Sequence, residues 1–180
     1  MIRPPRPDEL EALRALERDA GRAFAAAGMP EIARHEPPPL AELEAFRAGR
    51  RAWVAVNEAD RPVAYLLSSV VDGCAHIEQV SVAPSHAGRG LGAALIEHLA
   101  AMAAAPTLTL TTFRDVPWNA PYYERLGFTV VEPTDQGPEL AALVRHEAAT
   151  IPGDAARVAM RRPGLHKAEA AGAERARQRR

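Results

Sequence analysis

Helical periodicity dominates the first third of the chain. Apolar residues over 9–27 recur at helical spacing, with Asp8 at a capping position and acidic residues in the first turn. We expect this helix to run to about residue 27, where Gly28 and Pro30 would end it. The apolar spacing over residues 40–48 predicts a second, short helix.

The middle of the chain changes to strand patterning. Three β-rich segments, residues 52–56, 62–71 and 75–82, are separated by the turn sequences 57–60 and 72–73. Short turns join antiparallel neighbours. The pattern therefore predicts an antiparallel meander of three strands.

The pattern changes again after the third strand. Residues 84–92 are rich in glycine, residues 93–104 form a strongly apolar helical segment, and residues 107–113 are β-branched. A strand, a helix and a strand in that order predict a right-handed crossover and a parallel pair. The remaining elements expected are a helix at 120–126, a strand at 128–131, a helix at 140–149 and a strand at 157–161.

These elements predict one α/β domain over residues 1–162, with a mixed, mainly antiparallel sheet flanked by helices. Residues 163–180 are rich in Ala, Glu and Arg without an apolar stripe, so we expect a basic tail that is a frayed helix or disordered.

Composition excludes several classes of protein. The 180 residues are 47% hydrophobic and 25% charged, as in globular domains, and the formal net charge of −1 argues against a protein that wraps nucleic acid. A single cysteine excludes an internal disulfide framework. The six histidines lie at scattered positions, so no metal site is expected. No signal-like or membrane-spanning segment is evident, and we expect a cytoplasmic protein without membrane contact.

The most informative segment is a glycine loop, defined here as residues 88–92. It follows a strand, starts a helix, and has glycine at every second position: Gly88, Gly90 and Gly92. Glycines allow backbone N–H groups to converge, and a helix N-terminus carries partial positive charge, so the loop suits a phosphate or pyrophosphate. It has neither the lysine of a Walker A loop nor the spacing of a dinucleotide-binding fingerprint.

Residues 80–93 resemble motif A of the Gcn5-related N-acetyltransferase (GNAT) family, whose core reads Gln/Arg-x-x-Gly-x-Gly/Ala. Gly90 and Gly92 match the two small positions, while Ala87 stands at the Gln/Arg position. Residues 122–128, Tyr-Tyr-Glu-Arg-Leu-Gly-Phe, are similar to the family's Tyr-x-x-x-Gly-Phe signature. The order and separation of the elements agree with the family over about residues 1–162.

The resemblance implies acetyl-CoA as co-substrate, admitted where the strand before motif A splays from the strand after it. It implies that the backbone of Val80, Ser81 and Val82 pairs with the pantetheine arm. It also implies that the pyrophosphate lies on Gly88, Arg89, Gly90, Leu91, Gly92 and Ala93. Asn119 either lies near the coenzyme's arm or only caps the helix that follows it.

Acetyl transfer to an amine needs an acid for the leaving thiolate and a base for the amine. The resemblance implies that Tyr123 is the acid, and packing under the coenzyme is the alternative. Strand alternation places Glu78 and His76 on the same face as Val80 and Val82. Glu78 is the candidate base, with His76, or a structural or substrate-binding role, as alternatives.

The sequence therefore predicts an acetyl-CoA-dependent N-acetyltransferase. Transfer would be direct, in a ternary complex, to a primary amine of a small molecule, peptide or protein. Helices between residues 8 and 50, and the segment 133–151, would shape the acceptor site. The alternative is a non-catalytic coenzyme A-binding or regulatory module whose basic tail contacts RNA or a partner protein. A homodimer is left open.

Overall fold

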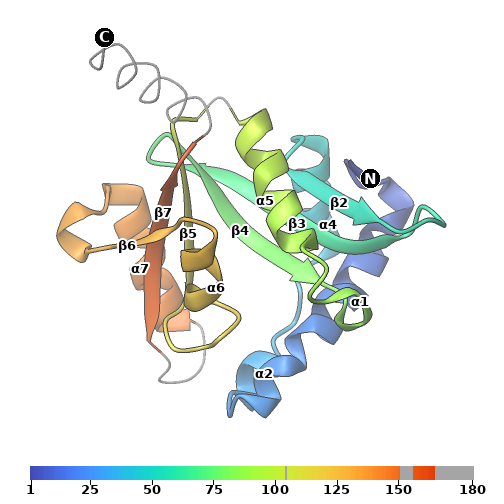
Figure 1. Ribbon diagram of the computed structural model, residues 1–180, viewed down its shortest axis with the longest axis horizontal. Coiled ribbons are helices and arrows are strands. Elements are labelled where there is room, and N and C mark those ends of the chain that lie inside the picture. Colours follow the sequence, from blue (N-terminus) through green and yellow to red (C-terminus); the bar gives the residue numbers. More distant parts are fainter. Residues whose placement is uncertain (104, 151–155, 165–180) are drawn as a thin grey trace, which may run out of the picture.

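A computed structural model describes residues 1–103, 105–150 and 156–164, and these form one α/β unit around a seven-stranded sheet (Figure 1). The strand order is β1-β2-β3-β4-β5-β7-β6, and β4–β5 is the parallel pair among antiparallel neighbours. The mixed, mainly antiparallel sheet and the crossover predicted from the sequence are confirmed. The strands are β1 Ile2–Arg3, β2 Ala52–Val56, β3 Pro62–Val71, β4 Cys74–Val82, β5 Thr107–Phe113, β6 Thr129–Val131 and β7 Arg157–Pro163.

Helices cover both faces of the sheet. The longer helices are α1 Leu10–Gly21, α4 Leu40–Ala48, α5 Leu91–Met102 and α7 Pro138–Thr150. The short ones are α2 Ala23–Ala26, α3 Pro30–Ala33 and α6 Ala120–Arg125, with 3-10 turns at Pro7–Glu9, Pro84–His86 and Pro133–Asp135. Helices α5 and α6 lie on the front face in Figure 1, and α1, α4 and α7 lie behind the sheet.

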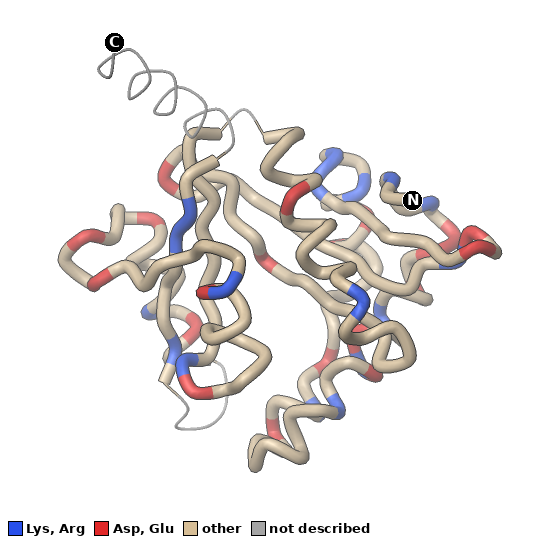
Figure 2. The backbone as a smooth tube through the Cα atoms, in the orientation of Figure 1, with Lys and Arg blue, Asp and Glu red and all other residues tan. Residues whose placement is uncertain are grey.

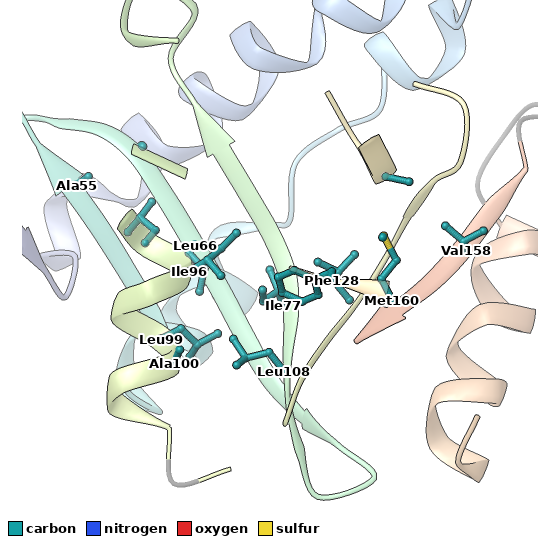
Figure 3. Packing of buried hydrophobic residues seen from close by; sticks show 14 residues of the cluster. Ala55, Leu66, Ile77, Ile96, Leu99, Ala100, Leu108, Phe128, Val158 and Met160 are labelled. Carbon is teal, nitrogen blue, oxygen red and sulfur yellow. The ribbon is translucent and has the colours of Figure 1, made fainter. Parts of the chain in front are cut away.

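The main core lies between α5 and the centre of the sheet. Figure 3 shows Ile96, Leu99 and Ala100 of α5 directed toward Leu66 of β3 and Leu108 of β5. These side chains are almost fully buried, so α5 is held firmly over the strands. A separate cluster joins α1 and α4 to the other face of β2 and β3.

Strands β4 and β5 pair only at their first residues. The paired positions are Ala75 with Leu108, His76 with Thr109, and Ile77 with Leu110. Beyond these, β4 stays paired with β3 as far as Val82, and β5 stays paired with β7 as far as Phe113. The two strands therefore separate toward their carboxyl ends, as Figure 1 shows. Edge N–H and C=O groups exposed in such an opening can bind an extended ligand.

Several sequence-based boundaries were wrong at the N-terminal side. The predicted helix over 9–27 is divided at Arg22 into α1 and α2, and Asp8 lies inside the preceding 3-10 turn instead of capping α1. Pro30 begins α3 instead of only ending a helix, because its fixed φ suits a first helical position. Strand β1 was not predicted, since two residues carry no periodicity. The tail expected from residue 163 begins within β7, and residues 165–180 lie outside the described part of the chain.

Candidate active site

The glycine loop ends at the first turn of α5. Gly88 and Gly90 adopt left-handed φ values of 73° and 74°, and Gly90 is the N-cap of the helix. Space is not the reason for glycine here, because a Cβ at either position would meet nothing within 4 Å. The reason is the backbone conformation, which other residues adopt only with strain. The helix begins at Leu91, two residues earlier than predicted, so the first-turn N–H groups belong to the loop itself.

Helix α6 brings the second motif against this first turn. An ideal Cβ on Gly92 would lie 2.9 Å from the hydroxyl oxygen of Tyr122 and 3.6 Å from Cγ1 of Val80. The backbone N–H of Ala93 donates to the Tyr122 hydroxyl. Two motifs separated in sequence therefore meet beside β4.

Tyr123 packs beneath Tyr122 against the main core. Its ring is edge-on to Phe128, with centroids 5.8 Å apart, and to Tyr122, with centroids 5.4 Å apart. Burial, followed by the neighbouring Tyr122, raises the pKa of Tyr123 above the usual value for tyrosine. The hydroxyl is therefore protonated throughout the physiological range and can act only as a donor of its proton.

Asn119 lies at the N-cap position of α6, but its side chain makes no capping hydrogen bond. Its Oδ1 accepts a hydrogen bond from Thr112 Oγ1 at 2.9 Å. Its Nδ2 is buried and has no hydrogen-bond partner within the described residues. Helix capping by the side chain, one of the two roles expected, is therefore wrong. A buried donor left without a partner near the end of β5 suits a ligand atom instead.

A β-bulge places Glu78 differently from the prediction. Leu67 pairs with Gln79 and Ser68 with Ile77, so Glu78 is the extra residue on β4. The bulge shifts the alternation: Val80 and Val82 pack against the α5 core, whereas His76 bonds Thr109 on the other face. The prediction that Glu78 and His76 share a face with Val80 and Val82 was wrong for this reason. Glu78 is exposed and accepts a hydrogen bond from Ser69.

His76 is not suited to act as a base. Its side chain is 1% exposed, and Nδ1 lies 2.9 Å from Thr109 Oγ1. Burial lowers the pKa of His76 to about 4, against a smaller opposing effect of Glu147. The imidazole is therefore neutral at physiological pH, but it is too weakly basic and too enclosed to deprotonate an amine efficiently.

An aromatic cluster, which sequence reasoning missed, joins α2 to the end of β5. The Phe24 ring lies 5.7 Å from Phe113 and 5.8 Å from Trp118, both edge-on. Arg157 stacks over Phe113, with Cζ 4.7 Å from the ring centroid. Trp118 stays 43% exposed. The only sequence signal was that two of the few aromatic residues flank the β5–α6 connection.

Charge is distributed without a dominant sign, as the interspersed basic and acidic segments in Figure 2 show. Within residues 1–103, 105–150 and 156–164, no cluster of three or more His, Cys, Asp or Glu side chains is arranged to hold a metal ion. In the same ranges, no helix has the length and apolar character needed to cross a membrane.

The fold is that of known acetyltransferases. The crystal structure of a GNAT-family acetyltransferase from Staphylococcus aureus Mu50 matches with a TM-score of 0.67 and 13% identity, covering 91% of this chain and 98% of that chain. The structure of Rv2747 from Mycobacterium tuberculosis, in complex with CoA and NLQ, matches with a TM-score of 0.68 and 19% identity. The match covers 92% of this chain and 99% of Rv2747.

Residues 11–128 match the acetyltransferase (GNAT) family, and the chain belongs to this family. A relative of known name is the peptidyl-lysine N-acetyltransferase YjaB of Escherichia coli K12, which is 36% identical over 78 residues. That match covers 43% of this chain and 49% of YjaB, so the chain spans about half the length of this relative.

The state of His76 can be measured directly. We expect its imidazole to titrate in the native protein near pH 4, because burial disfavours the charged form. The unfolded chain titrates near pH 6.5, so it binds more protons between the two values, and the free energy of unfolding falls as pH drops from about 6.5 to 4. Histidine NMR titration, assigned with His76→Gln, tests this. A native midpoint above 6 contradicts it.

Proposed function

We propose that this chain is an acetyl-CoA-dependent N-acetyltransferase that moves the acetyl group directly to a primary amine in a ternary complex. Membership of the GNAT family supports the activity. The observation that carries the proposal is the separation of β4 from β5 beside the glycine loop, against which α6 places Tyr122 with Tyr123 packed next to it.

In this proposal the pyrophosphate of acetyl-CoA binds the first-turn N–H groups of α5. The helix N-terminus supplies partial positive charge, and the exposed Arg89 adds a charge-assisted contact. The pantetheine arm enters the opening and pairs with the backbone of β4 at Val80, Ser81 and Val82. The partnerless Nδ2 of Asn119 donates to the arm.

Starting from an ammonium group, the reaction needs two protons removed from the nitrogen and one supplied to the sulfur. The ammonium group loses one proton and attacks the thioester carbonyl, a backbone N–H near Val82 stabilises the oxyanion, and the nitrogen loses its second proton as the tetrahedral intermediate collapses. When the C–S bond breaks, Tyr123 gives its proton to the thiolate. The coenzyme enters from the α5 side, so the amine must approach from the face that carries α1, α2 and α7.

The position of Glu78 favours a role in attracting the acceptor. Glu78 is an exposed carboxylate at the bulge, on the acceptor face, and it forms no ion pair within the described residues. It differs in this respect from Glu9 and Glu147, which both bind arginine. An exposed carboxylate of this kind draws an ammonium group toward the opening.

We propose a lysine side chain of a peptide or protein as the acceptor, because YjaB is named a peptidyl-lysine N-acetyltransferase. The test follows thiol release from acetyl-CoA with an α-N-blocked peptide carrying one lysine. The same peptide with norleucine is the blank, and peptides with a free α-amine and small polyamines are competitors. Coenzyme binding without thiol release for any amine would support the non-catalytic alternative.

Coenzyme binding should depend on Gly90. Replacing Gly90 with valine puts a β-branched side chain beside the first-turn N–H groups, and we expect the affinity for coenzyme A in calorimetry to fall at least about tenfold, the loss of roughly one charge-assisted hydrogen bond. Gly73→Val is the matched control, since Gly73 also has a left-handed φ of 70° and open space, but lies in the β3–β4 turn. Equal affinities for both variants would place the pyrophosphate elsewhere.

Tyr123→Phe should separate catalysis from binding. The variant keeps the ring and its packing but has no proton to give, so turnover should fall by about 10²-fold, the lower end for a general acid, because a thiolate is already a fair leaving group. Tyr122→Phe is the control, because its hydroxyl points to the N–H of Ala93. Turnover is compared at saturating acetyl-CoA and peptide. Similar near-normal rates in both variants would leave Tyr123 with a packing role only.

A further inference from the structure

A chain of hydrogen bonds runs from β4 to a carboxyl group on α1. Gln79 Nε2 donates to Ser81 Oγ at 2.8 Å, and Ser81 lies opposite Tyr65 of β3 in the strand ladder, where its side chain interacts with the Tyr65 hydroxyl. The Tyr65 hydroxyl in turn donates to Glu17 Oε2. We call Ser81, Tyr65 and Glu17 the hydroxyl relay. The relay ends at the Glu17 carboxylate, which accepts from Tyr65, and each hydroxyl can both accept and donate a proton, so a proton can pass along it toward Glu17.

The relay lies where the proposed reaction takes place. Ser81 stands between Val80 and Val82, on the part of β4 that has left β5. Ser81 and Tyr65 are on the α1 face, because Tyr65 belongs to the cluster that packs against α1. This is the face from which the amine must approach. Both side chains are buried, Ser81 being 4% and Tyr65 1% exposed, so these two hydroxyls are shielded from bulk water.

Glu17 is a half-buried acid that lacks an arginine ion-pair partner among the described residues. Its neighbours on α1, Arg14 and Arg18, form ion pairs with Glu11 and Glu36 instead. Burial raises the pKa of Glu17, while the Tyr65 hydrogen bond, His35 and the two arginines oppose this effect. A desolvated carboxylate without an arginine partner lowers the free energy of unfolding. Carboxyl groups with a pKa raised in this way are enriched at functional sites.

We propose that Glu17 takes up the proton that the acceptor amine loses, delivered through Ser81 and Tyr65. This inference rests on the proposed acetyltransferase function. The ammonium N–H bond breaks and its proton goes to Ser81 Oγ, the Ser81 proton goes to Tyr65, and the Tyr65 proton goes to Glu17. The amine nitrogen bonds the acetyl carbon, the C–S bond breaks as the nitrogen gives its second proton to water, and Tyr123 protonates the thiolate. Glu17 later releases its proton to water on the side of the exposed His35, and Tyr123 regains one from water.

The relay gives the two acidic residues on this face different tasks. Glu78 is exposed and attracts the ammonium group, so its loss should raise KM for the peptide. In the proposal, Glu17 does not contact the acceptor and acts only through Tyr65. Replacing the Glu17 carboxyl group should therefore lower kcat. A carboxyl group with a raised pKa is a stronger base than an ordinary one, which suits this task.

The experiment compares Glu17→Gln, Tyr65→Phe and the double variant with the wild type, using the lysine peptide and saturating acetyl-CoA. Glutamine still accepts the Tyr65 hydrogen bond but takes no proton. We expect each single variant to lose about 10²-fold in kcat, the double variant to lose no more than either, and the acidic limb of the kcat–pH profile to disappear.

Thermal unfolding separates this role from a structural one. Because the pKa of Glu17 is raised by folding, its stabilising contribution is present at low pH and is lost as pH rises through that value. Glu17→Gln should therefore be as stable as the wild type at pH 8, or more stable, despite its lost activity. A purely structural Glu17 would give a lower Tm with the pH profile retained.

Two control variants complete the test. Glu11→Gln removes an exposed carboxylate from the same helix and should keep full activity. Glu78→Gln should raise KM with kcat nearly unchanged. Full kcat in Glu17→Gln, or an unchanged acidic limb, overturns the relay while leaving the acetyltransferase intact. A wild-type protein that binds coenzyme A but acetylates no amine overturns the proposed function, and the relay with it.

Discussion

The separation of β4 from β5 is the constraint on which the rest of the structure depends. A parallel pair would ordinarily continue to the ends of both strands, since each unpaired N–H or C=O group in a protein interior is costly. Here β4 stays paired with β3 and β5 stays paired with β7, so the backbone groups left without a strand partner are those on the two edges that face the opening. A bulge bends its strand and increases the local twist, and the bulge at Glu78 follows directly after Ile77, the last β4 residue that pairs with β5. The opening is therefore built into the pairing of the sheet.

The two faces of this opening differ in chemistry because different elements cover them. On the α5 side, glycines in left-handed conformations and the tyrosines of α6 surround a helix N-terminus. On the α1 side, hydroxyls and carboxyls lie among aromatic rings. A direct transfer between a phosphorylated coenzyme and a cationic amine needs such a division, because one substrate requires positive potential and the other negative.

Strands and the glycine loop were predictable from local pattern, whereas the polar geometry of the site was not. β3 and β5 have the predicted bounds, because β-branched runs between turn residues are strong local signals. The bulge at Glu78 was not predictable, because it depends on how β4 pairs with β3. Contacts such as Phe24 with Trp118 or Tyr65 with Glu17 join positions far apart in sequence. No periodicity encodes them.

Burial moves the protonation equilibria of three groups in the direction that keeps each neutral. His76 is held as neutral imidazole, Tyr123 as neutral phenol, and Glu17 is shifted toward its neutral acid. Of these three, Glu17 is the group that burial makes a stronger base, whereas burial makes His76 a weaker base and leaves Tyr123 holding its proton. In the mechanism proposed here, Glu17 takes up a proton on the acceptor face and Tyr123 supplies one on the coenzyme side. The same desolvation is compatible with these opposite roles, because the two groups start from opposite sides of neutral pH.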